Sequence, residues 1–132
     1  MRSVFILVVV GFIPFLSFAD ENPCDIVDGG VTAGYMCVEQ KVSSAQNQLD
    51  MALNGAIDRV KEEQKYLQHS TNDNIVESLN KAQKSWIEFR DNQCLFDGQT
   101  MTSSPWQGVQ IEECKLKKIL SRIEYLNSIF VE

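Results

Sequence analysis

The sequence predicts a small all-α protein, a bundle of three main helices stapled by two disulfides. Apolar residues recur at steps of three and four along most of the chain, and no run alternates apolar and polar residues for long enough to form a paired strand. Four cysteines stand beside segments rich in turn-forming residues. Disulfides are a common means of stabilising a chain that is too short to build a large core.

The first 19 residues have the pattern of a secretory signal peptide. One basic residue precedes an apolar run, and Ser17 and Ala19 have the spacing of a cleavage site after Ala19. The apolar run is shorter than the roughly 20 residues that a membrane-spanning helix needs. We therefore expect residues 1–19 to be removed, and residues 20–132 to form a single helical domain in the periplasm without membrane contact.

The chain is acidic, with 18 Asp and Glu against 12 Lys and Arg and a formal net charge of −6. Loss of the signal peptide, with its one basic residue, would leave −7. Such a charge argues against nucleic acid and anionic lipid as partners and suits a basic partner. Solubility alone is the alternative explanation.

The four cysteines, Cys24, Cys37, Cys94 and Cys114, all follow the predicted cleavage site, and an even number in an oxidising compartment predicts two disulfides. Three pairings are open. We favour Cys24 with Cys37 and Cys94 with Cys114, because each pair brackets a loop rich in Gly, Ser, Thr or Pro. Zinc binding is the alternative role for the four cysteines, but there is no C-x-x-C pair and the single histidine, His69, is far from them in sequence. We therefore expect no metal and no cofactor.

The first helix should run from Tyr35 to near His69, after an irregular arm over residues 20–34. Gly55 interrupts its apolar stripe, at a cost of about 1 kcal/mol relative to alanine, and suggests a bend or a close helix contact. The stripe consists of Val38, Val42, Ala45, Leu49, Ala52, Leu53, Ala56, Ile57, Val60 and Leu67.

A second helix should begin with Asn or Asp as N-cap, because Glu77 stands three residues after Asn74 as in a capping box. A hydroxyl-rich loop over residues 97–108 and a third helix from about Val109 to Phe130 follow. The apolar positions of the second helix are Ile75, Leu79, Ala82, Trp86 and Phe89, and those of the third are Ile111, Leu116, Ile119, Leu120, Ile123, Leu126 and Phe130.

The segment KSWIEFRDNQC, residues 84–94, is either a reactive cluster or a structural one. On a helix, Trp86 and Phe89 would point into the core and Arg90 would lie partly buried at its edge. A buried guanidinium needs partners, for which the candidates are Asp50 and Glu124.

Asp91 would face solvent and could cap backbone donors of the following loop, while Cys94 could fasten the second helix to the third. We interpret these residues as structural, because Cys94 is expected to be oxidised and no histidine is near it in sequence. The acid pairs at 62–63 and 112–113 are typical of a solvated helix face. Nothing in the sequence requires an enzyme.

Residues 82–94, AQKSWIEFRDNQC, resemble the signature AQ-x-x-W-x-x-x-R-D-x-x-C of the LprI-like lysozyme-inhibitor domain, a family of small exported four-cysteine helical proteins. Further positions agree: Ala45 and Leu49 fall on the family's first-helix pattern A-D-x-x-L-N-x-x-Y, and Arg122 stands where the family has a closing arginine. The chain departs from the pattern at Gln46, Asp50, Leu53, Ser103 and Ile119.

The resemblance implies a protein that binds and blocks a peptidoglycan-cleaving muramidase. The partner could be a host lysozyme or a toxin delivered by a rival bacterium, in which case the chain is an immunity protein. Because lysozymes are generally basic, an acidic inhibitor would be steered towards them. The alternative is an envelope structural protein, and the apolar residues at 52, 53, 56 and 57 could serve a homodimer.

The partner would be met first by the loop 97–108, where Met101, Pro105 and Trp106 place apolar anchors in a polar segment. Trp106 could instead cover the core beneath the disulfide. Glu112 and Glu113 could face a basic cleft, although a solvated helix start is the simpler interpretation. The arm over residues 25–34 is the other candidate.

Overall fold

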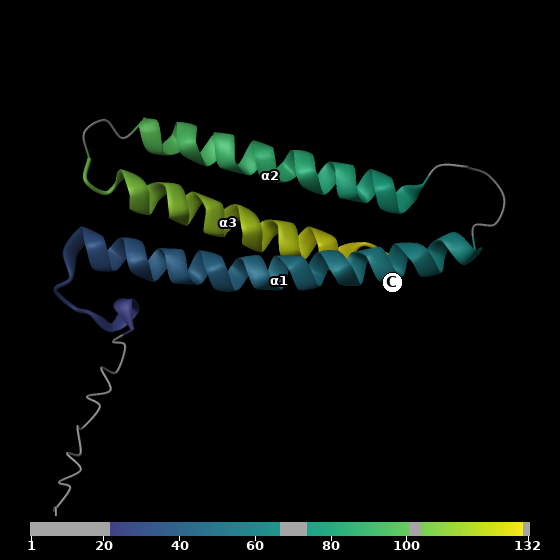
Figure 1. Cartoon of the computed structure of the whole chain (residues 1–132), viewed down its shortest axis with the longest axis horizontal. Coiled ribbons are helices and arrows are strands. Elements are labelled where there is room, and N and C mark those ends of the chain that lie inside the picture. Colours follow the sequence, from purple (N-terminus) through teal and green to yellow (C-terminus); the bar gives the residue numbers. More distant parts are fainter. Residues whose placement is uncertain (1–21, 67–73, 101–103, 131–132) are drawn as a thin grey trace, which may run out of the picture.

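The computed structural model describes residues 22–66, 74–100 and 104–130, and it confirms the all-α prediction (Figure 1). A short 3-10 helix, η1 (Pro23–Asp25), precedes α1 (Gly30–Tyr66), α2 (Ile75–Gln99) and α3 (Gln107–Ser128). None of the described residues forms a strand. The helix α2 runs antiparallel to both α1 and α3 (Figure 1). None of these helices has a stretch long and apolar enough to cross a membrane.

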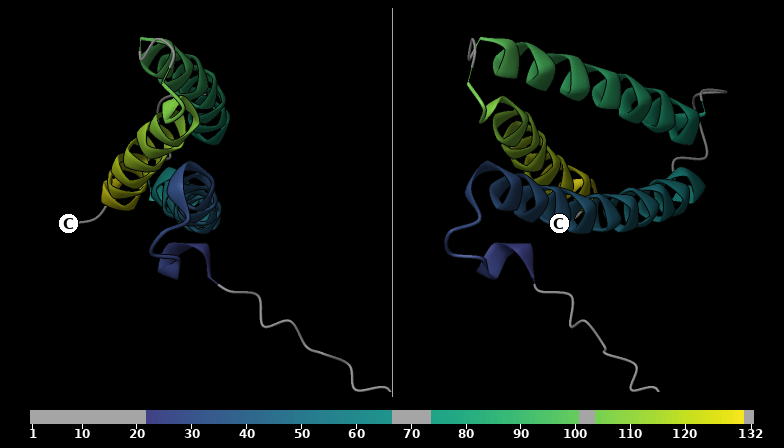
Figure 2. Two further views of the ribbon diagram at one scale, coloured as in Figure 1. Left: turned by 90° about the vertical axis from the view of Figure 1, so that its left-hand side faces the viewer. Right: turned by 60° about the vertical axis from the view of Figure 1, so that its left-hand side comes forward.

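The core lies mainly between α1 and α3. These two helices have the most extensive contact, whereas α2 packs chiefly on α3 and meets α1 sparsely, as the rotated views show (Figure 2). Alanines on α1 allow a close approach, and Leu79 and Trp86 of α2 cover the core from the other side. The buried cluster consists of Ala45, Leu49, Ala52, Ala56, Ile119 and Leu126.

The helix α1 begins at Gly30, five residues before the predicted start at Tyr35. Gly30 has a φ of +58°, which favours glycine, and Ala33 is already buried, so packing extends the helix into the expected arm. Gly55 does not break the helix, and an added Cβ there would meet only the Arg59 side chain, at 3.4 Å. The predicted end near His69, together with Leu67, lies outside the described residues.

The start of α2 is close to the prediction. The Asn74 side chain accepts a hydrogen bond from the Glu77 backbone N–H at 3.1 Å, as an N-cap does. The Glu77 carboxylate does not complete a capping box with the cap; it forms an ion pair with Lys81 at 2.8 Å.

The buried face of α2 differs from the predicted one. Phe89, expected in the core, is 56% exposed, and Ala82 is exposed as well. The buried residues of α2 are Gln83, Arg90, Cys94 and Gly98, all but one of them polar or sulfur-bearing. The predicted burial of Arg90 is confirmed, but Phe89 and Ala82 were placed in the core wrongly, because polar contacts and a disulfide fix the rotation of this helix.

The helix α2 also extends to Gln99, so the connection to α3 is shorter than the predicted loop 97–108. Gly98 lies inside the helix against the side chain of Ile111 in α3, with which an added Cβ would collide. The glycine indicated a loop from the sequence, but in the structure it permits close packing of two helices.

The far end of α3 is tied to α1 by Arg59. Its guanidinium donates to the backbone oxygens of Leu126 at 2.7 Å and Ile129 at 2.8 Å. The Leu126 oxygen also accepts from the Ile129 backbone N–H at 3.4 Å, and Arg59 adds side-chain donors from a neighbouring element to the carbonyls at this helix end. The contact spans about seventy residues of sequence, and periodicity along one helix does not predict it.

Candidate functional site

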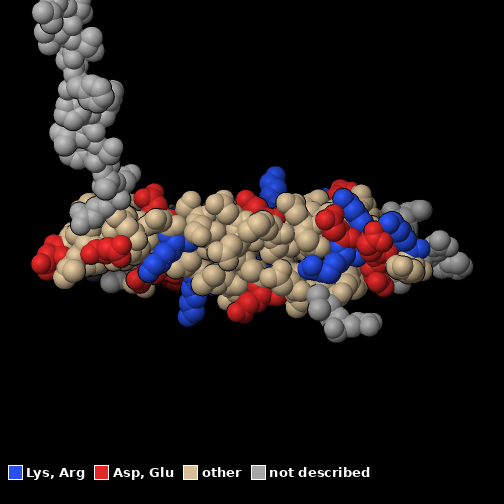
Figure 3. All heavy atoms as spheres, turned by 90° about the horizontal axis from the view of Figure 1, so that it is seen from below, with Lys and Arg blue, Asp and Glu red and all other residues tan. Residues whose placement is uncertain are grey.

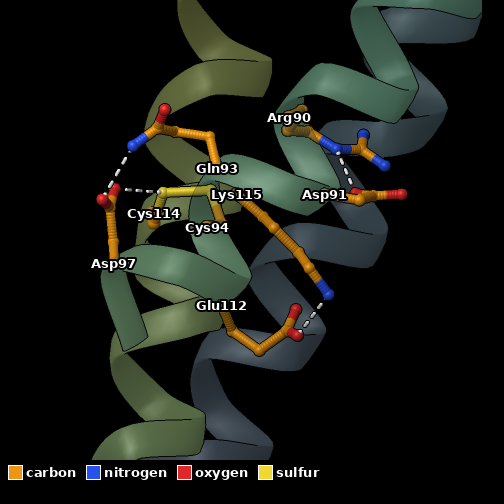
Figure 4. Close-up of a disulfide and its surroundings, with 8 residues drawn as sticks. All are labelled: Arg90, Asp91, Gln93, Cys94, Asp97, Glu112, Cys114 and Lys115. Atoms are coloured by element: carbon orange, nitrogen blue, oxygen red, sulfur yellow. Dashed lines mark hydrogen bonds and ion pairs between the residues drawn. A yellow bond between two sulfur atoms is a disulfide. The ribbon is translucent and has the colours of Figure 1, made fainter. Parts of the chain in front are cut away.

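Both predicted disulfides are present, and both lie near the same end of the bundle. Cys24 and Cys37 join η1 to α1 with a Cα–Cα distance of 4.7 Å. Cys94 and Cys114 join α2 to α3 with a Cα–Cα distance of 5.5 Å (Figure 4). We call residues 22–45, 90–100 and 104–115 the disulfide end.

A carboxylate accompanies the second disulfide. Asp97 lies one turn beyond Cys94, and its Oδ2 is 3.5 Å from the Cys114 sulfur (Figure 4). Gln93 donates to the other carboxylate oxygen at 2.8 Å and so holds the side chain in place. With Cys94 fully buried and all four cysteines paired, this cluster offers no thiol nucleophile.

The Trp86 ring has two guanidinium groups close to it. The Arg90 guanidinium carbon is 5.3 Å from the Trp86 ring centroid, and that of Arg122 is 5.5 Å from it. Arg122 also lies 4.7 Å from the Tyr125 ring and donates from Nε to Gln83 Oε1 at 2.9 Å. Burial lowers the pKa of Arg122, against a smaller opposing effect of Tyr125, but a guanidinium stays charged at neutral pH.

Arg90 is 9% exposed and is held by polar partners. Its Nε lies 2.8 Å from Asp91 Oδ1 and its Nη1 donates to Gln46 Oε1 at 3.1 Å. The predicted partners, Asp50 and Glu124, are wrong: Asp50 accepts from Gln46 instead, at 3.0 Å. Asp91 was expected to cap a loop, but its carboxylate pairs with Arg90 (Figure 4).

The signature residues therefore build a frame that joins three helices. Gln83, Trp86 and Arg90 of α2 reach Arg122 of α3 and Gln46 of α1. Sequence reasoning identified Trp86 and Arg90 but missed Gln83 as the partner of Arg122, although both belong to the family resemblance. Within residues 22–66, 74–100 and 104–130, no group of three acidic, histidine or cysteine side chains could hold a metal ion.

Trp106 lies between the arm and the start of α3. Its side chain is 45% exposed, and its ring packs over Gly34, where an added Cβ would be 3.0 Å from Trp106 Cζ3. The ring lines a notch of about 280 Å³ that is also bordered by Cys24, Ile26 and Val27. The structure thus brings together two of the predicted candidates, the arm and the segment around Trp106.

The other predicted contact residues are spread over different places. Pro105 is exposed beside Trp106, whereas Met101 lies outside the described residues. Glu112 is only 9% exposed and pairs with Lys115 at 2.7 Å, so its carboxylate is not free to face a partner (Figure 4). Glu113 is exposed but lines a groove between α2 and α3, away from the notch.

Charge is distributed unevenly along the bundle. The disulfide end contains seven acidic and three basic residues, a net charge of −4, while the other described residues contain seven acidic and eight basic ones. On the face seen in Figure 3, acidic side chains mark the left-hand end, and both signs alternate at the opposite end. The acidic residues of the disulfide end are Asp25, Asp28, Glu39, Asp91, Asp97, Glu112 and Glu113.

Comparison with known proteins agrees with the frame that the signature residues of α2 build with α1 and α3. The sequence pattern of the family described as lysozyme inhibitor LprI matches residues 28–126, which include the whole of α2 and all but the last two residues of α3. No curated protein and no solved structure matches the chain significantly. The family match extends over most of the sequence, and the chain therefore belongs to the lysozyme inhibitor LprI family.

Proposed function

We propose that the protein binds a lysozyme-type muramidase through its disulfide end and blocks the cleft of that enzyme. The family match supports an inhibitor of lysozyme. We choose this surface because of the uneven charge distribution. A net charge of −4 at the disulfide end would orient the molecule towards a basic enzyme.

The disulfide end also offers apolar anchors. Ile26 and Val27 of the arm, Met36 of α1 and Trp106 before α3 are all substantially exposed. Tryptophan is frequent among the residues that contribute most to protein interfaces. The two disulfides hold these segments in place before binding, which reduces the conformational entropy lost on association.

The same surface suits an immunity protein. Two disulfides and membership of this family are features of an extracellular or periplasmic protein, and a signal peptide over residues 1–19 would export the chain to that compartment. There it would meet either a host lysozyme or a muramidase toxin from a rival bacterium. We propose the toxin as the natural target; an inhibition panel that contains muramidases of both origins would separate the two.

A homodimer through α1 receives no support from the packing. Of the apolar residues at 52, 53, 56 and 57, which suggested it, the first three belong to the core or pack against it, and Ile57 is partly buried. The alternative of an envelope protein without inhibitory activity is the outcome expected if no muramidase is inhibited.

The proposal is tested by lysis of a cell-wall suspension with a panel of muramidases and the purified chain, residues 20–132. We expect at least one enzyme to be inhibited. The double variant Asp25→Asn/Asp28→Asn should inhibit about three- to tenfold less well at low salt, mainly through slower association, and the difference should shrink as salt is added.

The matched control is Glu88→Gln/Glu124→Gln, which removes the same charge from exposed positions outside the disulfide end. It should inhibit like the unchanged protein. The proposal is lost if no muramidase is slowed even by a large excess of the chain. Equal effects of the two double variants would show that only net charge matters and that the disulfide end is not the docking surface.

A further inference from the structure

A second candidate surface lies between α2 and α3. The α2–α3 groove has a volume of about 650 Å³, within the range of small-molecule sites, and is lined only by residues of these two helices. It is separate from the Trp106 notch, because the two share no lining residue.

The walls of this groove combine aromatic rings with cations. Lys118 Nζ lies 5.1 Å from the centroid of the Phe89 ring, and Arg122 lies beside the Tyr125 and Trp86 rings. Phe89 and Tyr125 are each more than half exposed. These rings are therefore accessible next to positive charge, an arrangement that suits a ligand with a ring beside an anionic group.

The cations of the groove are available to a ligand. In the part of the chain that the structure describes, neither Lys117, Lys118 nor Arg122 forms an ion pair. Arg122 bonds Gln83 through Nε, so its two terminal nitrogens remain free to donate to a carboxylate. The acidic lining residues, Asp97 and Glu113, belong to the disulfide end, whereas Lys117, Lys118 and Arg122 lie further along α3.

The charge of this wall is opposite to what a basic muramidase would require. The residues that line the groove include three cations and two carboxylates, a net charge of +1, and the cations are all on α3. This part of the groove therefore suits an anion better than a basic enzyme. The substrate of a muramidase is itself a ring-bearing anion, because peptidoglycan joins pyranose sugars to peptides that carry carboxylates.

We propose that the α2–α3 groove binds a carboxylate-bearing glycopeptide of the cell wall, with a sugar ring against Phe89 and Tyr125 and a carboxylate at Lys118 and Arg122. The choice of ligand rests on the proposed function, whereas the groove and its charges do not. Binding of this kind would hold the inhibitor beside the substrate that its target enzyme approaches.

The test uses N-acetylmuramyl dipeptide as the probe and isothermal titration with the chain of residues 20–132. Two further probes separate the parts of the proposal: an N-acetylglucosamine trimer, which has rings but no carboxylate, and a glutamate-containing tetrapeptide, which has carboxylates but no sugar. We expect measurable binding of the first probe and at least about tenfold weaker binding of the other two.

The variant Lys118→Glu should weaken binding of the muramyl dipeptide about tenfold or more, because it replaces a cation with an anion. Lys84→Glu is its matched control, since Lys84 is exposed on α2 and does not line the groove. Phe89→Ala tests the ring contact, and the exposure of Phe89 makes the variant compatible with folding.

No binding of the muramyl dipeptide would overturn this inference, as would equal binding of the glutamate peptide or equal effects of Lys118→Glu and Lys84→Glu. The outcome is separable from that of the proposed function, because Lys118→Glu lies outside the disulfide end and should still inhibit the muramidase. Quenching of Trp86 fluorescence in a Trp106→Phe background would place the ligand in the groove, since the sequence contains only two tryptophans.

Discussion

Gln83 is a buried side chain whose acceptor oxygen holds the Nε of Arg122, and this bond connects α2 to α3 close to the Trp86 ring. Each guanidinium–tryptophan contact contributes about 0.5–2 kcal/mol when it is partly shielded from water. The amide therefore keeps Arg122 where its charge is shared by two aromatic rings.

Replacement of Gln83 by methionine keeps the length of the side chain but removes the acceptor. We expect the free energy of unfolding to fall by about 1–3 kcal/mol, because the Arg122 Nε–H loses its partner in a partly buried place. Urea unfolding followed by circular dichroism measures this. Gln48→Met, at an exposed position of α1, should change stability by no more than about 0.5 kcal/mol; a similar loss in both variants would contradict the role of the bond.

Residue roles were predictable only where one helix determines them. Trp86 and Arg90 could be placed near the core from their spacing, but one of the two partners of Arg90 is an amide on α1, 44 residues away. Phe89 was misplaced because periodicity gives a face without showing how much of it a neighbouring helix covers. Only a narrow strip of the α2 surface is covered, since α2 has few contacts with α1.

At the scale of elements, α2 is held most firmly at its C-terminal end. Cys94 is bonded to α3 there, and Gly98 allows Ile111 of α3 to pack against the α2 backbone. The sequence predicted the helices themselves from apolar spacing and caps. Their ends were less predictable, because both glycines suggest turns by composition. In the structure Gly30 begins α1 with a φ of +58°, and Gly98 lies inside α2 and permits close packing against Ile111.

Gly98→Ala should destabilise the protein by about 1–3 kcal/mol, because the new Cβ would collide with the Ile111 side chain and force α2 and α3 apart. Gly55→Ala should instead raise the free energy of unfolding. An added Cβ there would lie 3.4 Å from Arg59 Nη1, the one guanidinium nitrogen that does not bond the end of α3, and alanine is favoured over glycine inside a helix by about 1 kcal/mol. Thermal unfolding of both variants checks the pair, and stabilisation by Gly98→Ala would refute the close contact.

The whole molecule is asymmetric, with both covalent links and most of the net negative charge at one end. The fold class and the cysteine pairing were predictable, because helical spacing and loop composition are local signals. The charge asymmetry was not, because it arises only when α2 folds back, which places Asp91 beside the N-terminal half of α1 and Asp97 beside Cys114 of α3. The notch under Trp106 likewise joins segments about seventy residues apart.

The two disulfides should contribute unequally to stability. The chain-entropy estimate is about 3 kcal/mol for each, with loops of 13 and 20 residues. Cys94→Ala/Cys114→Ala should cost more than Cys24→Ala/Cys37→Ala, because Cys94 is fully buried whereas Cys24 is exposed, and the first pair adds a packing loss. Urea midpoints of the two double variants measure the difference; a greater loss from the Cys24–Cys37 pair would contradict this account.

The Cys94–Cys114 bridge also closes a covalent ring that contains the whole connection from α2 to α3. A protease that cuts one peptide bond inside this ring nicks the chain without dividing it, since the sulfur link still joins the two pieces. The turn before Trp106 lies inside this ring, so a single cut there does not separate the chain into two molecules. Only reduction after cleavage would break the covalent link to α3, so in an oxidising compartment the nicked and intact molecules have the same covalent composition apart from one added water.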